Sequence, residues 1–427
     1  MKLSINRIAQ LGLMIAIVIP VSSDAMTLDQ AIEIGREHSL RQMAPVYARE
    51  KVEGQITEAW SNALPQVDAL ASYQRNFAAP SGQPDNLGVA SITLTQPIYT
   101  FGRINAGLNA AFATRRSTDH QANQTEKTLE LDVMKGFWSV LFLEEVIQVR
   151  RDALAVAEGV LERMTRLRDV GMLSDFEVLR ARSQVSLLVP GVLQAENDHN
   201  LAQLALLELL GLPLDTAVTI EGSLSNFSVE IGADTTLQHA LARDDLEAMR
   251  EGVKAYSEIY TIYRNAGMPS LGAQLKLNQQ WGDDEFDFVS SNSATTLSGG
   301  IALNIPVWSS GRVSGKADQI RADLRRMQLD LQMAERGVQL QLASSQSNYR
   351  TAQLKMESAA VAVNEASEAR RIAEIQLENG QVTPLDLQTS QLNETSVKLG
   401  LVNAKFSLLV AEAQLRLAAG HHPYVGR

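Results

Sequence analysis

The chain has 427 residues and carries 38 Lys and Arg against 49 Asp and Glu, a formal net charge of −11. An acidic chain without a basic stripe cannot neutralise a phosphate backbone, so no nucleic-acid partner is expected. The absence of cysteine excludes disulfides and a lipid on an N-terminal cysteine. An aromatic content of only 5%, together with long Ala, Leu, Gln and Glu tracts, favours extended helices over two or three globular domains.

The first 25 residues have the pattern of a secretory signal peptide. Lys2 and Arg7 precede an apolar run over 11–21, and small residues follow at Ser23 and Ala25. The run is too short for a membrane-spanning helix, and no run of 18 or more apolar residues follows it. We therefore expect 1–25 to be removed on export.

The next elements are a helix and two strands. Thr27 is a suitable N-cap for a helix over 28–62, and Pro45 predicts a bend or a split within it. Residues 66–75 and 87–97 alternate apolar and polar side chains, which predicts two β-strands.

A very long helix follows these strands. Residues 103–170 contain no proline, and a helix of that length would measure about 100 Å. Gly171 predicts its end, and Ser174 can cap a second helix that runs to Leu210 with an irregularity at Pro190.

The second half of the chain repeats the first at a constant shift of 209 residues. The segment Leu94–Arg103 (LTQPIYTFGR) returns as Leu303–Arg312 (LNIPVWSSGR), and Gly171 returns as Gly380. Each copy is far longer than the repeat unit of a solenoid protein, so we interpret each copy as half of a symmetric structure.

The second copy therefore predicts the same order of elements. We expect a helix near 236–265, strands near 270–281 and 295–307, a proline-free helix over 312–379, and a helix over 384–419.

This layout divides the mature chain into a first structural repeat over 26–211, a linker over 212–235, a second repeat over 236–420 and a short tail over 421–427.

The strands show the pattern of a membrane barrel. In the first strand Val67, Ala69, Ala71 and Tyr73 share one face, and only Leu70 breaks the alternation. Strands of about ten residues, apolar on one face and polar on the other, are typical of bilayer-spanning barrels, although a soluble half-buried sheet shows the same alternation.

Aromatic residues stand at the ends of these strands, as they do at membrane interfaces. Tyr99 and its counterpart Trp308 mark one end, and Trp281 marks the other. Because the smallest barrels need about eight strands, the missing strands must come from other copies. Two copies would give a filled barrel and three would leave room for a pore.

The chain resembles the TolC family of outer-membrane efflux and secretion channels over 26–420. The resemblance rests on the duplicated layout and on four motifs: Thr27–Ala31 (TLDQA), Leu64–Pro65, Gln96–Arg103 (QPIYTFGR) and Val170–Leu179 (VGMLSDFEVL).

The resemblance implies a mainly α fold with a small β part. It implies a homotrimer in which each chain gives four transmembrane strands to one barrel in the outer-membrane lipid. Long coiled-coil helices, built from the two repeats, would continue the barrel as a tunnel into the periplasm. The implied partners are a periplasmic adaptor protein and an inner-membrane transporter. The resemblance implies no cofactor, no metal and no catalytic activity of the channel protein.

The candidate functional residues lie at the two helix-hairpin tips. In the family these tips contact the adaptor, although the glycines also serve simply as helix C-caps. The tip residues are Gly171, Met172, Leu173, Ser174, Gly380, Gln381, Val382 and Thr383.

Just beyond the tips, Glu177 and Asp386 occupy positions where the family places carboxylates at a periplasmic constriction. An acid in the first helical turn equally complements the helix macrodipole. Two departures from the family pattern are Val382, where some relatives carry a latching arginine, and Thr389, where some carry a second acid.

The remaining motifs carry no chemistry. The acidic run Asp283–Asp287 lacks calcium-loop spacing, the six histidines lack metal-ligand spacing, and no catalytic signature is present. We therefore predict a non-enzymatic, passive exit duct of a tripartite efflux or type I secretion system. The competing hypothesis is a soluble periplasmic coiled-coil adaptor or scaffold.

Overall fold

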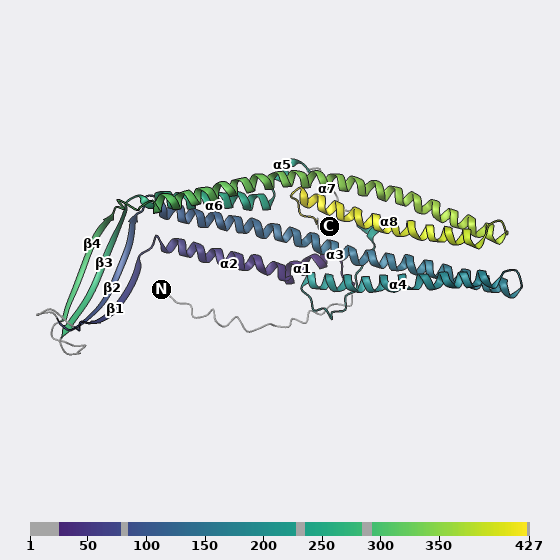
Figure 1. Cartoon of the computed structure of the whole chain (residues 1–427), viewed down its shortest axis with the longest axis horizontal. Helices are drawn as coiled ribbons and strands as arrows, with labels where there is room; N and C mark the ends of the chain where they lie inside the picture. Colours follow the sequence, from purple (N-terminus) through teal and green to yellow (C-terminus); the bar gives the residue numbers. More distant parts are fainter. Residues whose placement is uncertain (1–24, 78–83, 228–234, 284–292, 425–427) are drawn as a thin grey trace.

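The chain folds into a long, slender molecule with a β-sheet at one end and paired helices extending from it (Figure 1). The structure is a computed structural model that describes residues 25–77, 84–227, 235–283 and 293–424. The predicted signal peptide lies outside the described residues except for Ala25, as does most of the Asp283–Asp287 loop.

The first repeat contains four helices, α1 (Leu28–His38), α2 (Leu40–Ser61), α3 (Arg103–Asp169) and α4 (Asp175–Leu210). Helices α1, α2 and α4 lie along α3, so that shorter helices flank one long helix (Figure 1). Pro190 lies inside α4, which remains one continuous helix.

The second repeat has the same arrangement. Short α5 (Leu237–Leu241), α6 (Asp244–Arg264) and α8 (Pro384–Ala418) accompany the long α7 (Arg312–Glu378). The 3₁₀ turn η2 (Leu224–Asn226) lies between the repeats, and η3 (Asn265–Gly267) follows α6. Helices α3 and α7 each span 67 residues.

The predicted helix over 28–62 is split at Ser39 rather than at Pro45, so this expectation was wrong in its position. Pro45 lies within α2, while Ser39 adopts an extended backbone between the two helices. The cause is tertiary: Gly211 has φ of +74°, and a Cβ there would lie 2.2 Å from the His38 carbonyl oxygen. The end of α1 is thus packed against the end of α4.

The predicted helix over 236–265 is also split, between α5 and α6. Arg243 separates the two helices with an extended backbone, and its buried guanidinium donates to Asp245 and to Gln341 Oε1 at 2.8 Å. Gly420 sits against the His239 carbonyl with φ of +92°, which repeats the contact of Gly211 with α1.

Four antiparallel strands form one sheet in the order β1-β2-β3-β4. They are β1 (Gln66–Arg75), β2 (Asn86–Tyr99), β3 (Ser270–Asp283) and β4 (Ser293–Asn304). The prediction of a mainly helical chain with a small β part is confirmed. The fourth strand ends at Asn304 instead of 307.

The register separates the two faces of the sheet along whole rows of paired residues. One row is entirely apolar and a neighbouring row, on the other face, is entirely polar. The apolar row is Ala69–Ile92–Leu277–Leu297, and the polar row is Asp68–Thr93–Lys276–Ser298. No helix of the described ranges covers the sheet (Figure 1), and every residue of β1 and β4 is exposed.

At the end of the sheet remote from the helices, Trp281 lies over Gly88 on the adjacent strand. The two residues are directly paired, and a Cβ at Gly88 would come within 2.1 Å of the indole ring. The absence of a side chain at Gly88 therefore makes room for the aromatic residue.

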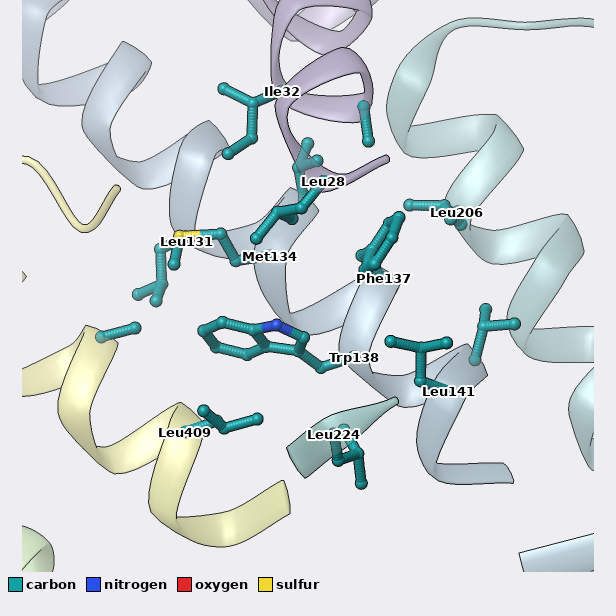
Figure 2. Close-up of a cluster of buried hydrophobic side chains, with 14 of the residues drawn as sticks. Leu28, Ile32, Leu131, Met134, Phe137, Trp138, Leu141, Leu206, Leu224 and Leu409 are labelled. Atoms are coloured by element: carbon teal, nitrogen blue, oxygen red, sulfur yellow. The ribbon is translucent and has the colours of Figure 1, made fainter. Parts of the chain in front are cut away.

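The hydrophobic core lies midway along the molecule, where α1, α4, η2 and α8 meet α3. Figure 2 shows Phe137 and Trp138 of α3 among Leu28, Leu206 and Leu409, which come from α1, α4 and α8. The counterparts of the two aromatic residues on α7 are Gln346 and Ser347, and both are exposed. The second repeat has a smaller core of its own, in which Ala240, Val338 and Leu342 stand at the positions of Ala31, Leu129 and Val133. This second core lacks the two aromatic residues.

Polar contacts between helices lie at the same height along the molecule as the hydrophobic core. The buried carboxylate of Glu130 binds Arg36 and lies 3.0 Å from Nδ1 of His422. Asp244 accepts hydrogen bonds from Lys127 and His120, both at 2.8 Å. Burial alone would raise the pKa of Asp244, but the hydrogen bonds and the positive charges of Lys127 and His120 together hold the pKa below its usual range. None of the helices in the described ranges combines the length and apolarity needed to cross a membrane.

Replacing Phe137 by Ala should destabilise the protein by about 3–5 kcal/mol, because its ring is 0% exposed and the change leaves a cavity. Gln346→Ala, at the equivalent exposed position, should stay within about 0.5 kcal/mol. Chemical unfolding followed by circular dichroism measures both changes. Equal effects would contradict the confinement of the aromatic core to the first repeat.

Candidate functional site

The hairpin tips are built by the same backbone turn in both repeats. Gly171 and Gly380 have φ of +78° and +70°, a region that glycine enters without a Cβ clash. After α3, Gly171 donates to the Arg168 carbonyl at 2.8 Å and Met172 to the Leu167 carbonyl at 2.9 Å. This pair of bonds is a Schellman motif.

The second tip closes in the same way. Gly380 donates to the Leu377 carbonyl at 3.0 Å, and Gln381 donates to the Gln376 carbonyl at 2.8 Å. Both turns therefore satisfy helix-end carbonyls with their own backbone, without using the side chains of the tip residues.

The helices that follow the tips start differently. Thr383 caps α8 with a full capping box, in which the Asp386 carboxylate accepts from Thr383 N at 2.8 Å and from its hydroxyl at 2.6 Å. These hydrogen bonds lower the pKa of Asp386. Ser174, the counterpart of Thr383, makes no side-chain capping bond at the start of α4.

Glu177 has a different environment from its counterpart Asp386. It lies beside Arg180 in a small cleft of about 20 Å³ between the two hairpins. Pro384 and Gln388 of α8 form the opposite side of this cleft. The two candidate carboxylates therefore do not share one environment within a single chain.

Polar contacts link the two hairpins near the tips. Gln388 of α8 donates to Gln184 Oε1 of α4 at 2.6 Å, and Arg163 of α3 lies 3.4 Å from Glu374 of α7. Neither pair follows the 209-residue shift, so sequence reasoning had no signal to find them.

The two tips also differ in polarity. The first tip exposes Met172 and Phe176, whose side chains are 74% and 67% exposed. The counterpart of Met172 is the polar Gln381, whereas the counterpart of Phe176 is Leu385, which is also apolar and is 45% exposed. A comparison of the two repeats position by position would have found this asymmetry, which inspection of each tip alone missed.

Thr383→Ala should open the first turn of α8, since losing an N-cap side chain typically costs about 1 kcal/mol. Ser174→Ala is the matched control and should leave the start of α4 unchanged. Hydrogen exchange of the two helix starts measures the difference.

The same measurement has a predicted pH dependence. Folding lowers the pKa of Asp386. The stability that its carboxylate adds to the first turn of α8 is therefore fully present above the ordinary carboxyl pKa, and it is lost as the pH falls through the lowered pKa. Identical exchange in both variants would contradict the capping asymmetry.

Comparisons with known proteins agree with this architecture. The chain is 22% identical over 425 residues to the outer membrane protein TolC of Vibrio cholerae, covering 96% of this chain and 95% of that protein. It is 22% identical over 378 residues to the outer membrane efflux protein BepC of Brucella suis, covering 86% and 79%.

The crystal structure of the outer membrane protein VceC from Vibrio cholerae superposes with a TM-score of 0.80 at 19% identity, covering 93% of this chain and 97% of that one. A sequence profile described as outer membrane efflux protein matches residues 33–212 and 236–421. The chain therefore belongs to the outer membrane efflux protein family, whose members form an efflux duct in the outer membrane and periplasm.

Proposed function

We propose that three copies of this chain form the exit duct of a tripartite efflux or type I secretion system. The sheets together would make a twelve-stranded barrel in the outer membrane, and the helices would continue it as a periplasmic tunnel. The duct is passive: an inner-membrane transporter supplies the energy, and a periplasmic adaptor joins the two.

The observation that carries the proposal is the uncovered sheet. The outer edges of β1 and β4 pair with no strand among the described residues, and one face of the sheet is lined with apolar rows. Lipid can cover an apolar face but cannot satisfy backbone N–H and C=O groups, so the edges must pair with other copies. Three copies give twelve strands, enough to leave an open lumen.

The repeat organisation supports the tunnel. In both repeats a helix of 67 residues leads from the sheet to an exposed tip, which gives a reach of about 100 Å. We assign 26–211 and 236–420 to the two repeats, with 212–235 as their linker and 1–25 as a removed signal. The tips then form the periplasmic mouth.

Cell fractionation tests the proposed function directly. We expect the protein in the outer-membrane fraction as a detergent-stable trimer that conducts ions in planar bilayers. Release by osmotic shock as a water-soluble monomer would instead support the adaptor or scaffold hypothesis.

We assign adaptor contact to the tip residues, with the first tip as the apolar part of the contact. Burying Met172 and Phe176 would contribute about 1.5–3 kcal/mol each, so the double change to Ser should weaken adaptor binding at least about tenfold. The matched change at Gln381 and Leu385 should have a smaller effect. Pull-down with the cognate adaptor measures both.

Channel conductance should be unaltered in both double variants, which shows that the trimers are intact. If both tips weaken adaptor binding equally, the assignment to the first tip is wrong.

We assign Glu177 and Asp386 to the periplasmic constriction, where each would form a ring of three carboxylates that favours cations. Glu177→Gln and Asp386→Asn should each shift the zero-current potential of a salt gradient toward lower cation selectivity. Asp318→Asn, far from the tips on α7, is a control with the same charge change. Unchanged potentials in both tip variants would count against the rings.

A further inference from the structure

The junction between the sheet and the helices has a charge opposite to that of the whole chain. Four cations lie there: Arg103 and Arg312 start α3 and α7, Arg264 ends α6, and Lys316 lies one turn into α7. We call these four residues the cation collar. Figure 1 shows the junction at the end of the sheet from which the helices extend.

The connecting segments that carry the collar lack acidic residues, and Glu58, Glu258 and Asp318 stand just outside them. The four connecting segments 59–65, 97–107, 259–270 and 305–317 contain no Asp or Glu, although the chain carries 49 of them. An acid-free zone in a chain of net charge −11 concentrates positive potential at one level of the molecule.

The collar cations also differ from those just beyond them in their partners. Arg115 pairs with Glu53 at 3.2 Å, Arg116 with Glu251 at 2.8 Å, and Arg321 with Asp318 at 2.7 Å. Within the described ranges no carboxylate forms an ion pair with a collar cation. Their charges are therefore available to an outside anion.

The surroundings of the collar suit a membrane surface. Trp308 is 85% exposed, and Tyr99, its counterpart in the first repeat, is exposed as well. Lys316 Nζ lies 5.5 Å from the centre of the Tyr263 ring. Arg312 and Lys316 line a hollow of about 620 Å³. Aromatic rings next to unpaired cations are typical of the depth at which lipid headgroups lie.

We propose that the cation collar binds the phosphate groups of anionic phospholipids at the periplasmic surface of the outer membrane. The proposal rests on the sheet crossing that membrane, as set out under Proposed function. The collar would fix the depth of the barrel, because moving it inward would bury unpaired cations in hydrocarbon and moving it outward would lose the phosphates.

Fluorescence quenching in proteoliposomes tests the proposal. The full trimer is reconstituted into phosphatidylcholine vesicles that contain either brominated phosphatidylcholine or brominated phosphatidylglycerol. A Trp281→Phe background leaves Trp60 and Trp308 near the collar as the accessible fluorophores, since Trp138 is buried in the core. We expect stronger quenching by phosphatidylglycerol, and a preference that weakens as salt is added.

The test variant is Arg312→Gln with Lys316→Gln. It should lower the preference for phosphatidylglycerol by about fivefold per removed charge at low salt, the factor that corresponds to about 1 kcal/mol per basic residue near an anionic surface. Arg312→Lys with Lys316→Arg keeps both charges and should keep the preference.

The matched control is Arg350→Gln with Lys355→Gln, which removes two exposed cations farther along the same helix. It should retain the full preference. Equal quenching by the two lipids in the parent protein would overturn the proposal that the collar binds anionic lipid. So would a loss of preference for phosphatidylglycerol in the control as large as in the test variant.

The possible failures are distinguishable. Equal quenching by both lipids would contradict only the proposal that the collar binds anionic lipid. No quenching by either lipid would show that the sheet is outside the bilayer, and it would overturn the proposed function as well. A change in channel ion selectivity without a change in lipid preference would place the collar cations on the lumen and also overturn the proposal.

Discussion

The two unpaired edges of the sheet are the constraint on which the rest of the molecule depends. Strands β1 and β4 each present a row of backbone N–H and C=O groups, and no part of the described chain returns to cover them. In hydrocarbon each such group costs several kcal/mol when it is left unpaired. A single chain therefore cannot pair all the backbone groups of its sheet, and the sheet can be stable in a membrane only after assembly with other copies.

The internal duplication supplies the parts that this assembly needs. Each repeat gives a strand pair followed by a helix of 67 residues, so the circumference of the barrel passes directly into that of the helical body. Differences between the repeats then specialise the two halves. Phe137 anchors a core where Gln346 is exposed, and Thr383 builds a capping box where Ser174 makes none.

The sequence predicted the features that depend on local periodicity. The bounds of β1 and the two faces of the sheet followed from alternation, and the long helices followed from the absence of proline and from Gly171 and Gly380. The errors arose where contacts between segments distant in the sequence determine the position of a helix break. Ser39 breaks the first helix because Gly211 packs on His38, and Arg243 breaks another through contacts with α7 and α8. The cleft around Glu177 likewise requires both hairpins, which no local pattern reveals.

The absence of cysteine makes the central claim directly measurable. One cysteine is placed in β1 at Ala69, a second is scanned through 297–303 in β4, and the protein is oxidised in outer membranes and separated under denaturing conditions. Pairing of β1 with β4 of a neighbouring copy predicts covalent trimers at matching positions along the scan. Finding only monomers at every position would contradict the account.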